Sequence, residues 1–307
     1  GIGRPGAPEW RGAMGGRTVA VLGPGGVGGL VAALLARDGN DVVVLGREQT
    51  THVIAARGLT VRSAQLGDLH ADVDARPTLD RPVDLCVVAV KATALPDALD
   101  RAPRDVLGDG LVVPLLNGTE HMDVLRERYD PAQVAAGVIR VEAARTAPGR
   151  IVHSSPFVQV DLASTTAPRT RLDDATTALT SAGVQARVLD DEARALWDKL
   201  AFLAPFALLT TRYRAPIGEV RTTHRDELIA LVHEVAAISR AAGGTGDAAT
   251  ALARYEQFPA DARSSMQRDA EAGNPLELDA IGGAVLRAAE RYHLDALHTR
   301  TLVSALS

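Results

Sequence analysis

The sequence predicts an α/β protein in which a Rossmann-type, doubly wound sheet is followed by a mostly α-helical C-terminal domain. Apolar, strand-like runs alternate with helical segments from Thr18 to Leu189, and such alternation is typical of a parallel sheet built from βαβ units. A glycine-rich loop joins the first strand-like run to the first helix. From Glu192 onward the apolar residues recur with helical periodicity, so we place a domain boundary near Asp190.

The first strand, loop and helix carry a distinctive glycine pattern. Thr18–Leu22 has the composition of a buried strand. The loop after it consists of Gly23, Pro24, Gly25, Gly26, Val27 and Gly28. Gly23 allows a tight turn, Gly25 allows the backbone to approach a pyrophosphate at the helix N-terminus, and Gly28 allows close helix–sheet packing. A purely structural glycine turn is the alternative. A second strand at Asp41–Leu45 completes a unit of about 30 residues, which favours a dinucleotide site.

The residues after the second strand distinguish NAD from NADP. NAD sites usually place an Asp or Glu there, where it holds the ribose 2′-hydroxyl. This chain has Gly46 and Arg47 instead. A guanidinium can pair with a 2′-phosphate that a carboxylate would repel. We therefore predict NADP (NADPH) as the cofactor, with Glu48 keeping NAD as the alternative.

Further strands and helices alternate along the chain. We predict strands at Leu59–Arg62, Ala71–Asp74, Leu85–Val90 and Leu111–Leu116, and helices at Ala94–Leu107 and His121–Tyr129. Lys91 and Asn117 directly follow two of these strands. Because the carboxyl ends of parallel strands border the ligand-binding crevice of doubly wound sheets, both residues are site candidates. For Asn117, an ordinary Asn-Gly turn is the alternative.

The remaining strands precede Asp190, and the chain after it is helical. We predict strands at Arg150–His153, Phe157–Leu162 and Gln185–Leu189, and a helix at Leu172–Ser181. Helices follow at Glu192–Leu209, Arg225–Ala242, Ala248–Gln257, Leu276–Tyr292 and Ala296–Ala305. We expect a dinucleotide-binding domain at 17–190 and a helical substrate and catalytic domain at 191–307. Residues 1–16 are expected to be a disordered leader or an expression remnant.

The composition argues against several classes of partner. The 307 residues carry 33 basic against 38 acidic groups and few aromatic side chains, which argues against nucleic acid. No segment has the ~20 continuous apolar residues that span a membrane. Cys86 is the only cysteine, and its apolar surroundings favour a core thiol over a nucleophile. These features suit a cytoplasmic protein. We predict no metal site. A homodimer formed through the helical domain is possible, although no heptad repeat demands one.

Lysine is almost absent from the chain. Lys91 and Lys199 are the only lysines, and every other basic residue is arginine. Arginine does not readily release a proton, whereas the pKa of a lysine moves when its ammonium is desolvated. Lys91 and Lys199 are therefore candidates for positions that need ammonium chemistry or shape. The alternative is that both lysines survived by accident.

Several stretches together resemble one family. They are Gly23-Pro-Gly-Gly-Val-Gly28, Val90-Lys-Ala92, Leu115-Leu-Asn-Gly118, Leu196-Trp-Asp-Lys-Leu200, Ser264-Ser-Met-Gln-Arg-Asp269, Leu276-Glu-Leu-Asp279 and Gly282-Gly283. Their order and spacing are similar to those of the ketopantoate reductases, the NADPH-dependent 2-dehydropantoate 2-reductases of pantothenate biosynthesis. The resemblance implies that a dinucleotide-binding domain joins a helical domain, with the active site in the cleft between them.

The resemblance also implies roles for single residues. Lys199 matches the family's proton donor, and Glu277 matches its acidic residue near the nicotinamide and the substrate. Ser265 matches a serine that holds the substrate carboxylate. Three more residues match positions near the cofactor: Lys91, Asn117 and Ala144. Without the resemblance, a solvated helix carboxylate would be the better interpretation of Glu277.

Three departures from the family pattern concern the substrate. Where the family has three asparagines, two of them four and eight residues after the lysine, this chain has Leu203, Ala207 and Ile217. Each buried polar group left unpaired costs about 1–3 kcal/mol, so a more apolar ketone or 2-oxo acid is an alternative to 2-dehydropantoate. A non-catalytic NADP-binding regulatory module is the alternative from another class. The retained Lys199 and Glu277 argue against it, because binding alone needs no proton donor.

Overall fold

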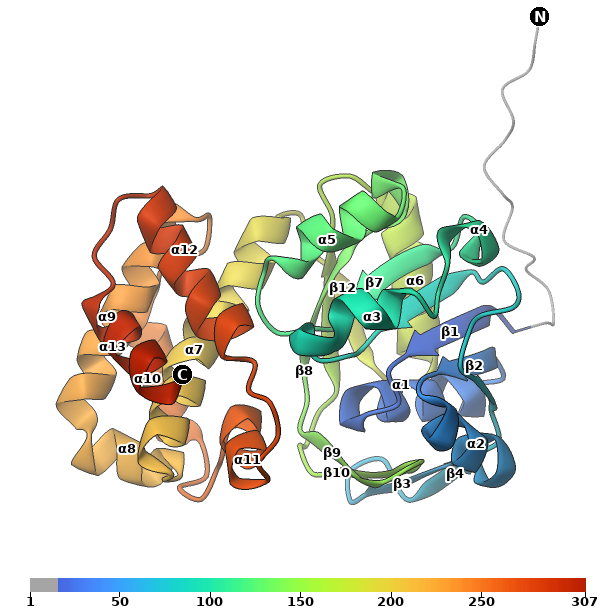
Figure 1. Cartoon of the computed structure of the whole chain (residues 1–307), viewed down its shortest axis with the longest axis horizontal. Coiled ribbons are helices and arrows are strands. Elements are labelled where there is room, and N and C mark those ends of the chain that lie inside the picture. Colours follow the sequence, from blue (N-terminus) through green and yellow to red (C-terminus); the bar gives the residue numbers. More distant parts are fainter. Residues whose placement is uncertain (1–15) are drawn as a thin grey trace, which may run out of the picture.

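The computed structural model describes residues 16–307. The leader expected at residues 1–16 therefore lies outside the described residues, except for Gly16. Three β-sheets with their flanking helices form one half of the molecule, and a helical bundle forms the other (Figure 1). Helix α7 (Glu192–Tyr213) runs from the sheets into the bundle. The predicted fold class is confirmed. No helix among residues 16–307 is long and apolar enough to cross a membrane.

The largest sheet is parallel and has the strand order β5-β2-β1-β6-β7. Its strands are β1 (Thr18–Leu22), β2 (Asp41–Leu45), β5 (Asp74–Arg76), β6 (Leu85–Val88) and β7 (Leu111–Pro114). Alternate residues of β1 enter two cores, as the period of a strand requires. Val19 and Val21 pack on the side of α1 (Gly26–Arg37), while Ala20 and Leu22 pack with α5 (His121–Arg128).

Two smaller sheets complete this half. One has the order β4-β3-β10-β9 and the other the order β12-β11-β8. Their strands are β3 (Leu59–Ser63), β4 (Leu69–Ala71), β8 (Ala136–Arg140), β9 (Ala143–Ala147), β10 (Arg150–His153), β11 (Gln159–Ala163) and β12 (Gln185–Val188). The sequence indicates most of these strands but not their division into separate sheets, because strand partners far apart in the chain leave no local signal.

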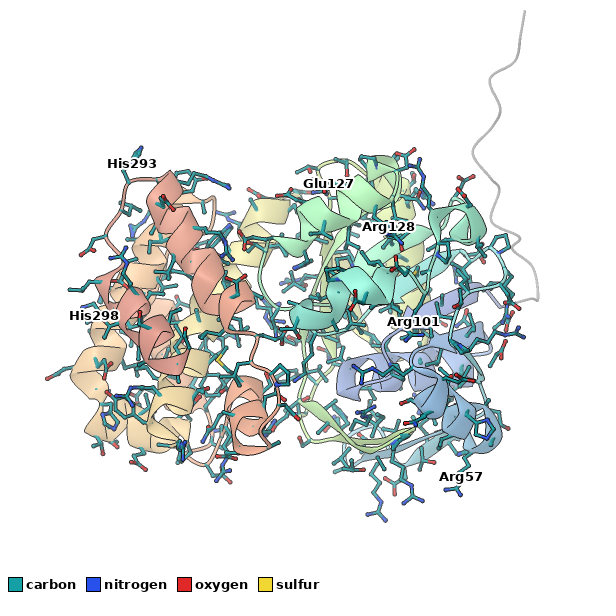
Figure 2. All side chains as sticks on the ribbon, viewed as in Figure 1. Arg57, Arg101, Glu127, Arg128, His293 and His298 are labelled. Carbon is teal, nitrogen blue, oxygen red and sulfur yellow. The ribbon has the colours of Figure 1, made fainter. Side chains whose placement is uncertain are left out.

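The helical half is built around α7 and α9 (Arg225–Ala241), which pack against each other. The other helices are α8 (Ile217–Thr223), α10 (Ala248–Gln257), α11 (Ser265–Glu271), the π-helix η3 (Asp279–Gly283), α12 (Ala284–Arg291) and α13 (Leu297–Leu306). Around the rim of both halves, exposed polar side chains such as Arg57, Glu127 and His298 reach outward (Figure 2).

The single helix predicted at Ala94–Leu107 is wrong. The chain forms the short 3-10 helix η1 (Ala92–Ala94), then α3 (Leu95–Leu99) and, after a break, α4 (Arg104–Leu107). Pro103 explains the break, because proline lacks a backbone N–H and disfavours the helical conformation in the residue before it.

Several predicted boundaries also differ from the structure. The strand predicted at Ala71–Asp74 is wrong, because β4 ends at Ala71 and β5, in another sheet, begins at Asp74. Strands β6 and β7 end at Val88 and Pro114, so Lys91 and Asn117 lie in the loops beyond them. Nearby strand ends therefore still bring both residues to the same edge of the sheet.

The helix predicted at Leu276–Tyr292 begins late and irregularly. Leu276 and Glu277 are not helical, and the first turns form the π-helix η3 before α12 continues to Arg291. Single π-turns of this kind often occur at functional sites. Helices α8 and α11 were not predicted, because seven residues show too little periodicity.

Candidate functional site

The glycine loop between β1 and α1 is packed so closely that three of its four glycines have no room for a side chain. Gly23 has a φ of +98°, which favours glycine. A Cβ at Gly28 would lie 1.9 Å from the carbonyl oxygen of Gly23. A Cβ at Gly26 would lie 2.3 Å from the carbonyl oxygen of Ala143 on β9. Ala144, the next residue of β9, therefore lies beside the loop.

Gly25 is the open point of this loop. Apart from its neighbours in the chain, none of residues 16–307 has an atom within 4 Å of the position that its Cβ would take. Gly25 is also the N-cap of α1, and no side chain caps this helix. The backbone N–H groups of the first turn, from Gly26 and Val27 onward, therefore point toward open space. A helix N-terminus of this kind can bind a phosphate.

Arg47 lies next to this loop. The Pro24 ring packs beside Gly46, where a Cβ would lie 2.9 Å from the proline Cδ. Arg47 follows Gly46 as the N-cap of α2 (Glu48–Arg57), and its side chain is exposed. Glu48 is exposed as the first residue of that helix. A guanidinium is thus available beside the loop, where a 2′-phosphate would need one.

Two contacts join the loop after β6 to the helical half. Glu277 is buried, and its Oε2 accepts a hydrogen bond from the backbone N–H of Ala92 at 3.0 Å. Lys91 forms an ion pair with Asp269 on α11. These two contacts thereby bring residues of the two halves together. Asp269 was not predicted, because its partner is distant in sequence.

Lys199 lies on α7, between the two halves of the molecule. Burial lowers the pKa of its ammonium to about 8, the positive charge of Arg140 acts in the same direction, and the carboxylate of Glu277 opposes both. Lys199 is therefore protonated near neutral pH, yet it can release its proton more readily than an exposed lysine. A pKa close to the working pH suits a general acid.

His121 is a neighbour of Lys199 that the sequence did not single out. Its side chain is buried, and its Nε2 has no hydrogen-bond partner among residues 16–307. Burial lowers the pKa of His121 to about 4, and the charge of Lys199 contributes in the same direction. The imidazole is therefore neutral at physiological pH. The sequence does not mark His121 as a site residue, because a histidine at the start of a helix is common.

Asn117 and Ser265 belong to opposite halves, and both lie near contacts that join these halves. Asn117 is half-buried, and Gly118 beside it has a φ of +91°. A Cβ at Gly118 would lie 2.6 Å from the carbonyl oxygen of Ala280 in η3, so this loop touches the helical half. Ser265 is exposed at the first turn of α11. It shares a helix face with Asp269 one turn later, the face directed at Lys91.

The three positions that depart from the family pattern are not equivalent. Leu203 is partly buried one turn after Lys199. Ala207 and Ile217 are only 1% and 0% exposed and belong to the core of the helical half. Leu203 can therefore contact a ligand, whereas Ala207 and Ile217 present no surface to one.

Comparison with known families matches both halves of the chain. Residues 19–164 match the family model described as ketopantoate reductase PanE/ApbA, and residues 191–307 match the model for the C-terminal part of the same family.

Individual relatives are similar over nearly their whole length. The chain is 27% identical to the uncharacterized oxidoreductase YkpB of Bacillus subtilis, over 93% of this chain and 96% of that protein. It is 25% identical to the 2-dehydropantoate 2-reductase of Archaeoglobus fulgidus, over 93% and 95%. The crystal structure of 2-dehydropantoate 2-reductase from Geobacter metallireducens superposes with a TM-score of 0.87 at 26% identity, covering 94% and 98% of the two chains.

The fold and these matches together define an oxidoreductase that uses NADPH and acts on a carbonyl–alcohol pair. The chain belongs to the ketopantoate reductase family.

Proposed function

We propose that this protein reduces the carbonyl group of a 2-oxo acid and that Lys199 donates the proton. The environment of Lys199 carries this proposal, because burial and Arg140 lower the pKa of the ammonium and Glu277 lies near it. NADPH, when bound, supplies the hydride. As negative charge develops on the carbonyl oxygen, an ammonium within hydrogen-bond reach stabilises it and supplies the proton.

The remaining candidate residues would bind and orient the reactants. The loop from Gly23 to Gly28 would hold the pyrophosphate and Arg47 the 2′-phosphate, with Lys91, Asn117 and Ala144 nearby. Glu277 would fix the loop after β6 through the N–H of Ala92, a bond of 3.0 Å, and would counterbalance the charge of Lys199. Ser265 would hold the substrate carboxylate.

We propose 2-dehydropantoate as the first candidate substrate, since it is named for the relatives in Archaeoglobus and Geobacter. A more apolar 2-oxo acid is the second candidate. Leu203 supports it, because this apolar side chain lies one turn from Lys199 and is partly exposed. Ala207 and Ile217 are buried and present no surface to a substrate, so these two of the three substitutions no longer argue for an apolar substrate.

The test is NADPH oxidation by the purified protein with 2-dehydropantoate and with a series of apolar 2-oxo acids. We expect turnover of at least one of them, and Lys199→Met should lower kcat/KM by about 100- to 10,000-fold, the usual contribution of a general acid. NADPH affinity and thermal unfolding serve as controls that the Lys199→Met variant is folded and binds its cofactor. Undiminished turnover by this variant would disprove the role of Lys199, and no turnover by wild type would favour a non-catalytic NADP-binding module.

A further inference from the structure

A cavity of about 220 Å³ lies between α7, α9 and α10 and reaches Arg140 at the end of β8. Much of its wall is apolar, with Phe202, Val232 and Ala236 among the lining residues. Phe202 is one turn after Lys199 on α7, and residues three apart on a helix are surface neighbours. Lys199 does not line the cavity itself, but Asp198, its neighbour in the chain, does. A guanidinium group, that of Arg254 on α10, also lines it.

Arg254 is a half-buried cation without an anionic partner. Its guanidinium lies over the ring of Phe202, with Cζ 4.1 Å from the ring centroid. It makes no hydrogen bond or ion pair with any of residues 16–307. Burial lowers the pKa of Arg254, and the charge of Arg140 acts in the same direction. Arginine remains protonated nonetheless. A partly desolvated charge of this kind gains most when an anion joins it.

Arg140, which also lines the cavity, shares its carboxylate partner with a second arginine. Its Nη1 donates to Oδ2 of the buried Asp161 at 2.9 Å. The same carboxylate also accepts a hydrogen bond from Arg187 at 2.7 Å. One carboxylate therefore serves two guanidinium groups. The charge of Arg140 lowers the pKa of both Lys199 and Arg254, so Arg140 is near both groups.

The carboxylates of Asp198 and Asp247 also line the cavity, and each accepts a hydrogen bond from a backbone N–H. Asp198 accepts from the backbone N–H of Thr245 at 2.7 Å. Asp247 caps α10 and accepts from the backbone N–H of Thr250 at 3.0 Å. Neither forms an ion pair with Arg254 among the described residues. The cavity is thus lined by the guanidinium groups of Arg140 and Arg254, and by two carboxylates that accept hydrogen bonds from backbone N–H groups.

We infer that Arg254, with Arg140 beside it, binds a carboxylate of the 2-oxo acid whose carbonyl group Lys199 protonates. This inference rests on the proposed function and extends its substrate-binding residues beyond those that the family resemblance implies. The planar guanidinium matches a carboxylate in fork geometry. The bound carboxylate is either the one next to the carbonyl group or a second one at the far end of the substrate, and the experiment separates these two sources.

The kinetic test compares Arg254→Gln with wild type on three substrates. They are 2-dehydropantoate, the dicarboxylate 2-oxoglutarate and the uncharged methyl ester of a 2-oxo acid. We expect the variant to raise KM about 10- to 100-fold for a substrate whose carboxylate Arg254 binds, as expected for a lost charged hydrogen bond, and to leave the ester within about twofold. An increase for both acids identifies the carboxylate next to the carbonyl group, and an increase for 2-oxoglutarate alone identifies a distal carboxylate. Equal effects on acids and ester, or no effect, would overturn the inference.

Two further variants separate charge from structure. Arg254→Lys keeps the positive charge and should recover part of the lost affinity, which a purely structural role would not predict. Arg291→Gln removes an exposed arginine at the end of α12 that forms no ion pair within residues 16–307. It should leave every KM within about twofold of wild type.

A binding measurement keeps the inference independent of turnover. Oxamate and N-oxalylglycine resemble a 2-oxo acid with one and with two carboxylates, and uncharged oxamide is the control. Calorimetry on the NADPH complex should show at least tenfold weaker binding of one of the two anions to Arg254→Gln, and no change for oxamide. Arg254-dependent binding without turnover of any 2-oxo acid would support the carboxylate site and reject the proposed reaction. If a 2-oxo acid is turned over and Arg254→Gln leaves anion binding unchanged, the result would support the proposed reaction and reject the carboxylate site.

Discussion

At the scale of single residues, the charges around Lys199 set a pH limit for the proposed reaction. Burial and Arg140 lower the pKa of Lys199 to about 8, against the opposing effect of Glu277. The ammonium is present below this pH and is lost as the pH rises through it. We therefore expect kcat/KM for reduction to be level below about pH 7 and to fall about tenfold per pH unit above 8. Steady-state assays between pH 6 and 10 measure this profile.

The variant Glu277→Gln tests whether the falling limb of this profile reports the pKa of Lys199. The amide oxygen of glutamine can still accept the hydrogen bond from Ala92, but its neutral side chain no longer raises the pKa of Lys199. The falling limb should therefore shift below pH 8. A limb that stays at its wild-type position in Glu277→Gln would contradict the assignment of Lys199 as the acid, because Glu277 acts on the pKa of Lys199.

At the scale of the strand–loop–helix element, two adjacent glycines should respond differently to the same change. Gly25 has an ordinary φ of −82° and open space around it, so Gly25→Ala should fold normally and block the approach of a phosphate. Gly26 abuts the carbonyl oxygen of Ala143, so Gly26→Ala should destabilise the fold by about 1–3 kcal/mol through overpacking.

Thermal unfolding and NADPH titration of both variants test this contrast. We expect Gly25→Ala to keep the wild-type Tm and to bind NADPH at least about tenfold more weakly, corresponding to about 1.4 kcal/mol. Gly26→Ala should show a lower Tm. Unchanged NADPH affinity in Gly25→Ala would show that the cofactor does not approach this residue.

The same element shows what local sequence can and cannot predict. The strand, glycine loop and helix from Thr18 to Arg37 follow from buried residues and glycines that are neighbours in the chain, and the structure confirms them. The packing of Gly26 against β9 could not be predicted, because it depends on a strand more than a hundred residues away. The pairing of Lys91 with Asp269 was missed for the same reason.

At the scale of the whole molecule, polar contacts join the two halves. Arg287 on α12 donates to Glu120, with Nε 2.9 Å from Oε2, and Arg268 on α11 pairs with Glu142. The buried hydrogen bond between Glu277 and the backbone N–H of Ala92 is a third contact between the halves. The relative position of the two halves therefore depends partly on charge.

This dependence predicts a salt-sensitive stability. The side chains of Arg268 and Arg287 are 42% and 43% exposed, and an exposed ion pair contributes about 0–1 kcal/mol. The double variant Arg268→Gln/Arg287→Gln should unfold a few degrees below wild type at 50 mM NaCl, as about 1 kcal/mol implies for a chain of this size. At 1 M NaCl, where the Debye length is about 3 Å, the difference should vanish.

The control is Arg291→Gln/Arg300→Gln, which removes two exposed arginines without ion pairs among residues 16–307. It should match wild type at both salt concentrations. A difference that persists at 1 M NaCl would mean that Arg268 and Arg287 stabilise the protein through packing of their side chains and not through their charge.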